Sequence, residues 1–349
     1  MLKQLLCSVS RLAITLTVTL TATLIGLCLA GTGTARAADV IKIASIAPSG
    51  SIYHRVLQEI GEAYRVSQGP GSRAIVYADS LQGTEADTVR RMRVGQLDAS
   101  MLSITGLSHI DTSVTALQFM PMMFRSWQEV DHVREQLRPE FEAKLAARGF
   151  VVLMWGEAGW VQFFTREAIS YPNEFKRTPV WVWDGYPAQV DIMKSMGFRP
   201  VPLPIADILP GLETGLLDTV PVAPMWALAG QFDRVTHYML PINWVPIVGA
   251  TVFRKKRFEA LAPHVREAVM AAARAGSDKL RAHRAIQDGH AIQAMRKRGL
   301  EVLQLTPEIE RAWTDVAREA WPRVRGTMVP ADTFDKVRKT LEEFRERSN

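Results

Sequence analysis

Short apolar runs alternate along the chain with segments whose apolar residues recur at helical spacing. Val40 to Ala47 is an almost continuous apolar run, and between Ile52 and Gln68 the apolar side chains fall on one side of a helical projection. The first pattern predicts a buried strand, and the second predicts a helix with one face against a sheet. Because the same alternation returns at 73–78, 84–94 and 97–101, the pattern predicts an α/β fold.

The stretch from Val180 to Pro224 shows this alternation most clearly. It predicts, in order, a strand at 180–183, a helix at 186–196, an extended segment at 198–203, a helix at 205–214 and a strand at 217–222. Open α/β sheets bind ligands at the carboxyl ends of their strands. Trp181, Trp183 and Asp184 stand at such an end, so we expect them at a ligand site.

Later segments predict longer elements. Ser126 to Arg148 reads as a helix broken at Pro139, since proline lacks the amide hydrogen that a helix interior needs. Residues 263–298 read as one long helix, too long at ~1.5 Å per residue to lie on a single small lobe. The remaining predictions are a strand at 150–155, an edge strand at 300–305, and helices at 307–325 and 331–347.

Certain short segments have a distinctive order and spacing. In the central stretch they are Val180-Trp181-Val182, Met196-Gly197-Phe198, Pro200-Val201-Pro202, Glu213-Thr214-Gly215-Leu216-Leu217-Asp218 and Ala223-Pro224. Earlier ones are Leu81-Gln82-Gly83, Gly95-Gln96-Leu97-Asp98 with Ser103 and Thr105 beyond it, and Phe119-Met120-Pro121-Met122-Met123-Phe124. Their arrangement resembles the solute-binding proteins of tripartite ATP-independent periplasmic (TRAP) transporters. The resemblance covers nearly the whole chain after its first residues.

This resemblance implies a two-lobed α/β binding protein with a long helix spanning both lobes. The lobes would be residues 38–160 and 161–253, with 254–349 supplying the spanning helix and closing helices that return to the first lobe. Trp160 to Thr165 would make the first crossing between lobes, and such crossings act as hinges.

The polar chemistry departs from that family. Family members bind a ligand carboxylate with an arginine that falls here on Trp181, assisted by an arginine that falls on Val161 and an asparagine that falls on Ala223. An Arg–carboxylate hydrogen bond contributes ~1.5–3 kcal/mol, whereas a buried Trp ring of 150–250 Å² at ~25 cal/mol per Å² offers an apolar ligand up to ~4–6 kcal/mol. The departure therefore favours an apolar or amphipathic ligand, with an organic acid as the alternative.

Other residues have two interpretations each. Trp181 and Trp183 point to the same face of their strand and could instead be core, as could the Phe119–Phe124 segment. Arg254 could restore a cation to the site, or could begin a solvated basic run. The candidate ligand-binding residues are Ser49, Tyr53, Ser103, Thr105, Trp160, Val161, Trp181, Trp183, Asp184, Ala223, Trp226 and Arg254.

The first residues have the composition of an export signal. Lys3 and Arg11 precede a long apolar run, and Ala35-Arg36-Ala37 is an A-x-A cleavage site, so residues 1–37 are predicted to be a signal peptide. Both cysteines lie inside it, which excludes thiol chemistry and disulfides from the mature chain. The segment also holds three cationic residues and no acid, so the formal net charge falls from +6 to +3 on cleavage.

The sequence offers little support for catalysis or nucleic-acid binding. It has no metal-ligand spacing among its histidines, no phosphate loop and no nucleophile elbow, and its basic residues alternate with acids in the last helices. We therefore predict a periplasmic, non-enzymatic binding protein without a cofactor, monomeric or dimeric, which delivers its ligand to the small and large TRAP permease subunits. The alternatives are a sensory or scaffold protein and, less favoured, an enzyme on the same fold.

Overall fold

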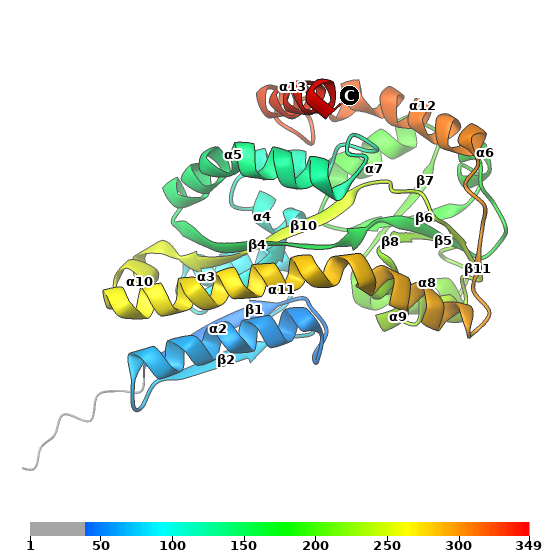
Figure 1. Ribbon diagram of the computed structural model, residues 1–349. Helices are drawn as coiled ribbons and strands as arrows, with labels where there is room; N and C mark the ends of the chain where they lie inside the picture. The colour runs from blue at the N-terminus through cyan, green and yellow to red at the C-terminus, as the bar shows by residue number, and fades with distance from the viewer. Residues whose placement is uncertain (1–38, 349) are drawn as a thin grey trace, which may run out of the picture. The chain divides into compact units, whose positions relative to one another are not determined.

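In the computed structural model, which describes residues 39–348, two β-sheets carry the fold (Figure 1). The predicted signal peptide lies outside the described residues. The first sheet has the strand order β2-β1-β3-β10-β4, with β10 antiparallel to both neighbours. Its strands are β1 (Val40–Ser45), β2 (Arg73–Tyr77), β3 (Ala99–Ser103), β4 (Phe150–Trp160) and β10 (Pro246–Arg254).

The second sheet has the order β11-β9-β5-β8-β6-β7. Its strands are β5 (Gln162–Thr165), β6 (Pro179–Trp183), β7 (Arg199–Leu203), β8 (Thr219–Val222), β9 (Tyr238–Leu240) and β11 (Glu301–Val302). The edge strand predicted at 300–305 is therefore present, but it is only two residues long, Glu301–Val302. We call the first sheet with its helices the first lobe, and the second sheet with its helices the second lobe.

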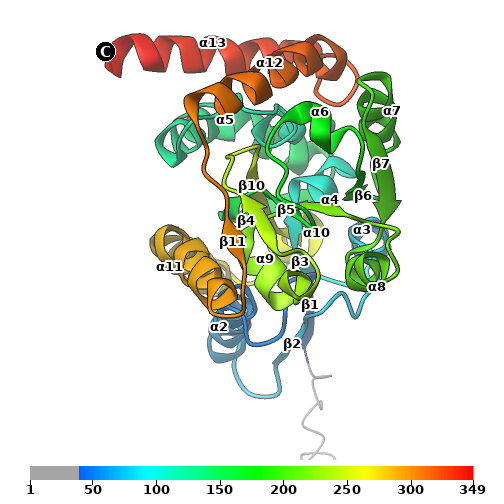
Figure 2. The same cartoon turned by 90° about the vertical axis from the view of Figure 1, so that its right-hand side faces the viewer.

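Helices cover both faces of each sheet. The first sheet packs against α2 and α11 on one face and against α3, α4, α5 and α13 on the other. The second sheet packs against α8, α9 and the end of α11 on one face and against α6 and α12 on the other (Figure 2). The helices are α2 (Ile52–Gln68), α3 (Glu85–Arg93), α4 (Ile104–Ser108), α5 (Trp127–Ala147), α6 (Pro172–Phe175), α7 (Pro187–Ser195), α8 (Ile208–Glu213), α9 (Pro224–Ala229), α10 (Lys255–Glu259), α11 (Pro263–Arg296), α12 (Pro307–Val324) and α13 (Ala331–Ser348). None of the helices in this part of the chain has both the length and the apolar content that crossing a membrane requires.

Helix α11 spans both lobes, as expected. Val265 and Val269 near its start are fully buried against α2 and the first sheet, while Ala291 and Met295 near its end pack into the second lobe (Figure 1). The helix is therefore a single rigid element that both sheets share.

Two strand crossings connect the lobes at one place. The chain passes from β4 to β5 through Val161 and returns from β9 to β10 through residues 241–245. Val161 donates its backbone N–H to Val245 O at 2.9 Å, and Trp244 donates to Val161 O at 3.0 Å. Strand β10 consequently belongs to the first sheet, whereas the predicted second lobe, residues 161–253, includes most of this strand.

Helix α5 is continuous, so the predicted break at Pro139 is wrong. Proline removes one intrahelical hydrogen bond, the one that would reach the carbonyl of Glu135. Glu135 is exposed, so water can replace the missing donor and the helix continues through Ala147.

Candidate functional site

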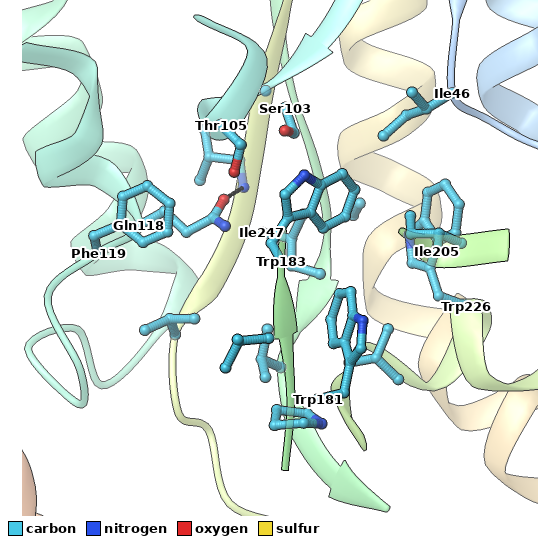
Figure 3. Close-up of a pocket in the computed structure, with 18 of the residues that line it drawn as sticks. Ile46, Ser103, Thr105, Gln118, Phe119, Trp181, Trp183, Ile205, Trp226 and Ile247 are labelled. Atoms are coloured by element: carbon cyan, nitrogen blue, oxygen red, sulfur yellow. Dashed lines mark hydrogen bonds between the residues drawn. The ribbon is translucent and has the colours of Figure 1, made fainter. Parts of the chain in front are cut away.

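A cavity of about 810 Å³ lies between the two lobes, a size typical of small-molecule sites. Its first-lobe wall comes from the loops after β1 and β2, the end of β3 and strand β10, and its second-lobe wall from β6, α7, β8 and α9 (Figure 3). The lobes also touch beside the cavity, where the rings of Phe119 and Tyr186 lie 4.6 Å apart.

The structure brings eight of the predicted site residues to this cavity and leaves four outside its lining. Those lining it are Tyr53, Ser103, Thr105, Val161, Trp181, Trp183, Asp184 and Trp226, and those absent from the lining within residues 39–348 are Ser49, Trp160, Ala223 and Arg254.

Each of the four has a different position from the one predicted. Trp160 is buried against Trp127, with ring centroids 5.1 Å apart, and Ala223 is fully buried as the N-cap residue of α9. Ser49 lies in the loop after β1, where its backbone N–H donates to Asp79.

Arg254 does not restore a cation to the cleft. Its guanidinium donates to Asp98 Oδ1 at 2.8 Å, and Gly95 lies close beside it. Arg254, the last residue of β10, therefore fixes the turn before β3, where Asp98 also accepts a hydrogen bond from the backbone N–H of Lys42. Neither predicted role fits, because the Arg254 side chain is partly buried and ion-paired with Asp98, and so neither faces the cavity nor begins a solvated basic run.

Trp181 and Trp183 lie on the same side of β6, as their alternation predicted. Their ring centroids are 5.7 Å apart at an interplanar angle of 66°. Trp181 is only 6 % exposed and donates its indole N–H to Leu203 O at 2.9 Å, so the surface it presents to the cavity is apolar. Trp183 is only partly buried, and both rings stand near Trp226 and Ile205 (Figure 3).

The second sheet is split where these tryptophans stand. Strand β6 pairs with β8 only at Val180 and Thr219, although both strands continue beyond that point. Pro221 in β8 has no N–H to donate to a neighbouring strand. Trp181 and Val182 on one strand and Val222 on the other therefore border the cavity instead of closing against each other.

A few polar side chains of the first lobe face the tryptophans. Ser103 donates its hydroxyl to Glu85 at 2.6 Å, and Glu85 also accepts the Ser103 backbone N–H at 2.6 Å. Burial raises the pKa of Glu85 despite these hydrogen bonds. Gln118 accepts the N–H of Val248 at 3.3 Å beside Thr105 (Figure 3). Sequence reasoning missed Glu85 and Gln118, because an acid in a first helical turn and a glutamine before an apolar segment carry no distinctive pattern.

The charged residues that line the cavity are all acidic. They are Asp79, Glu85, Glu157 and Asp184, and within residues 39–348 the lining contains no lysine, arginine or histidine. The Glu157 carboxylate forms ion pairs with Arg134 and with Arg284, whose Nη1 lies 3.5 Å from Glu157 Oε1. The Tyr53 hydroxyl donates a hydrogen bond to the backbone O of Glu157 at 3.0 Å, and burial raises the pKa of Tyr53. An anionic ligand would therefore find no opposite charge in the wall.

A buried carboxyl supports the crossing strands beside the cavity. Burial raises the pKa of Asp288 in α11 to about 6, outweighing the opposite effect of the nearby backbone N–H groups of Trp160 and Met225. Gly159 has φ of +97°, and a side chain there would meet Asp288 Oδ2 at 2.7 Å. The hinge is thus built around a glycine that leaves room for this carboxyl.

The described residues contain no group of three or more His, Cys, Asp and Glu side chains placed to hold a metal ion. The arrangement is that of a largely apolar binding cavity between two lobes, beside the strands that connect them.

Comparisons with known proteins agree with this architecture. Residues 43–326 match the family described as bacterial extracellular solute-binding protein, family 7. The chain is 23% identical over 269 residues to the 2,3-diketo-L-gulonate-binding periplasmic protein YiaO of Escherichia coli K12, covering 75% of this chain and 76% of that protein.

Solved structures share the fold. A TRAP periplasmic solute-binding protein from Shewanella oneidensis with bound succinate has a TM-score of 0.79 at 15% identity, covering 87% of this chain and 100% of that one. One from Xanthobacter autotrophicus Py2 with bound β-D-galacturonate has a TM-score of 0.77 at 17% identity, covering 86% and 99%. The chain therefore belongs to the bacterial extracellular solute-binding proteins of family 7, the DctP family, and it shares the fold of TRAP periplasmic solute-binding proteins.

Proposed function

We propose that this protein captures an uncharged, largely apolar small molecule between its lobes and delivers it to the small and large TRAP permease subunits. The observation that carries the proposal is the composition of the cavity wall: within the described chain it holds Trp181, Trp183 and Trp226 and no cationic side chain.

The energetic balance supports an apolar ligand. A carboxylate transferred from water without a cationic partner costs several kcal/mol, and the acids Asp79 and Asp184 at the cavity add repulsion. An apolar ligand that covers the tryptophan faces gains ~25 cal/mol for each Å² removed from water. The galacturonate and succinate bound by the structural relatives belong to those proteins, and this wall lacks the charge to hold them.

The test is direct. Protein purified from the periplasm would be analysed by native mass spectrometry, and co-purified molecules would be extracted and identified. Calorimetric titration with succinate and galacturonate would follow. We expect a neutral or amphipathic co-purified molecule and no binding of either acid in the micromolar range. Tight binding of succinate or galacturonate would contradict the proposal.

Export is part of the same proposal. The family is periplasmic, and the Ala35-Arg36-Ala37 site predicts a mature chain that begins at Ala38. The intact mass of the periplasmic protein should equal that of residues 38–349. A mass that retains residues 1–37 would indicate an uncleaved membrane anchor.

A further inference from the structure

The cavity extends through the split in the second sheet to the sheet's other face. Side chains of a strand alternate between faces, so Val180 and Val182 point away from the side on which Trp181 and Trp183 lie. All four nevertheless line the same cavity. A continuous space can border both faces of β6 because the strand separates from β8 after Val180.

The space behind the sheet is bounded by helices α7 and α12. On α7 and its C-cap the cavity is lined by Gln189, Ile192, Met193 and Met196, which share one helical face. No residue within α7 itself is buried, so this apolar face borders the cavity and does not pack closely on the sheet. We call the space lined by these residues, Val180, Val182 and the facing residues of α12 the rear compartment.

Helix α12 gives the rear compartment a fixed wall. Trp313, Val316, Ala320 and Val324 line the cavity at spacings of one helical face. Two indole N–H groups anchor this helix: Trp313 donates to Ser170 O at 2.8 Å, and Trp321 donates to Pro121 O at 2.9 Å. These bonds tie α12 to both lobes, so the wall is positioned independently of any ligand.

The polar groups lie at the opposite end. Ser103, Thr105 and Gln118 of the first lobe face Trp183 across the cleft (Figure 3), whereas the residues of the rear compartment are apolar apart from Gln189 at its border. A ligand that fills both regions needs a small polar group at one end and a hydrocarbon chain at the other.

We propose that the ligand is an elongated amphipathic molecule whose apolar chain passes between β6 and β8 into the rear compartment, with its uncharged polar group beside Ser103 and Thr105. This inference rests on the proposed function, since it assigns a shape to the ligand of the same cavity. It adds that β6 is a partition within the site and that α12 determines how long a chain can bind.

A series of 1-alkanols from butanol to decanol, titrated calorimetrically, tests the inference. In the natural protein the affinity should rise roughly fourfold per methylene along the series. The Ala320→Phe variant fills the rear compartment, so it should bind butanol within about twofold of the natural protein and decanol at least about tenfold more weakly. Arg318→Phe adds the same ring to the exposed side of α12 and should leave the series unchanged.

Ala320 is buried, so its enlargement could disturb folding. Val316→Phe, one turn earlier on the same face and only partly buried, provides the same comparison, with a thermal melt to establish that each variant is folded. The inference is overturned if the natural protein binds longer alkanols no more tightly than butanol. It is also overturned if the folded Phe variants show the same affinities as the natural protein, or if they bind butanol as weakly as decanol.

The outcomes also separate the two proposals. Alkanol binding that does not depend on chain length would overturn the rear compartment and leave an apolar ligand in place. Failure of every alkanol to bind, together with tight binding of succinate, would overturn both.

Discussion

The two tryptophans of β6 have different roles, although they lie on the same side of the strand. Trp181 is 6 % exposed, donates its N–H to Leu203 O and packs with Phe164 and Leu212 in the core of the second lobe. Trp183 is only partly buried. Both interpretations that the sequence left open therefore apply to this pair. Trp181 is a core residue that also lines the cavity, whereas Trp183 mainly lines the cavity.

Alanine substitutions should separate these roles. Trp181→Ala removes a buried ring and should lower the free energy of unfolding by about 3–5 kcal/mol. Trp183→Ala should lower it by less than about 1 kcal/mol but weaken the binding of an apolar probe such as octanol about tenfold or more. Urea denaturation and calorimetry would measure both. Unchanged octanol affinity in Trp183→Ala would contradict its place in the site.

A buried charge pair beside the cavity gives a second prediction at this scale. Arg134 and Glu157 are each only 2% exposed in their side chains. Arg134→Met leaves the carboxylate of Glu157 with Arg284 at 3.5 Å as its remaining cation, and should cost about 3–5 kcal/mol of unfolding free energy because an underpaired charge stays buried. The double variant with Glu157→Gln should recover part of that loss, and no recovery would argue against the pairing.

Among the elements, those with a strong local pattern were predicted and those defined by distant partners were not. The strand at Val180 and the helix within 84–94, which is capped by the Thr84 side chain accepting from Asp87 N, follow from neighbouring residues. The sheet to which β10 belongs depends on pairing with residues 86 to 154 positions away in the sequence, and the partner of Arg254 is 156 positions away. No local pattern encodes such contacts, so the lobe boundary and the role of Arg254 had to come from the structure.

Two glycines, one just before β4 and one near its end, offer a matched pair of substitutions. Gly149 and Gly159 have φ of +90° and +97°, but a side chain at Gly149 meets nothing within 4 Å, whereas one at Gly159 meets Asp288 at 2.7 Å. Gly149→Ala should cost only the left-handed penalty of about 1–2 kcal/mol. Gly159→Ala should cost clearly more in chemical denaturation, because Asp288 must also move. Equal costs would show that the carboxyl does not constrain the crossing.

Asp288 should also make the stability of this helix–hinge contact depend on pH. Its pKa is raised by burial from 3.8 to about 6, so the folded state holds the proton more tightly than the unfolded state. The stabilising contribution is complete below about pH 4 and is lost as the pH rises through 6. Asp288→Asn should therefore match the natural protein near pH 4 and exceed it by up to about 3 kcal/mol at pH 7, as measured by denaturation across that range. A difference that does not vary with pH would contradict this assignment.

At the scale of the whole molecule, capture requires the lobes to move about the crossing strands while α11 remains continuous. Phe119 in the first lobe contacts Tyr186 in the second, with ring centroids 4.6 Å apart, so this pair links the lobes across the cleft. Gly185 lies in the same turn, where an added side chain would stand 3.7 Å from Thr105. Aromatic pairs of this kind contribute about 0.5–1.5 kcal/mol, which is enough to bias an open–closed equilibrium without fixing it.

Tyr186→Ala should therefore shift the unliganded protein toward the open form. If only the closed form binds tightly, the apparent affinity falls in proportion to the closed fraction, and loss of ~1 kcal/mol from the closed state weakens binding up to about fivefold. Small-angle X-ray scattering should show a larger radius of gyration for the variant than for the natural protein, and saturating octanol should remove the difference. Tyr171→Ala, at an exposed tyrosine of the second lobe, should change neither quantity. Identical radii with a weakened affinity would mean that Tyr186 contacts the ligand and does not act through closure.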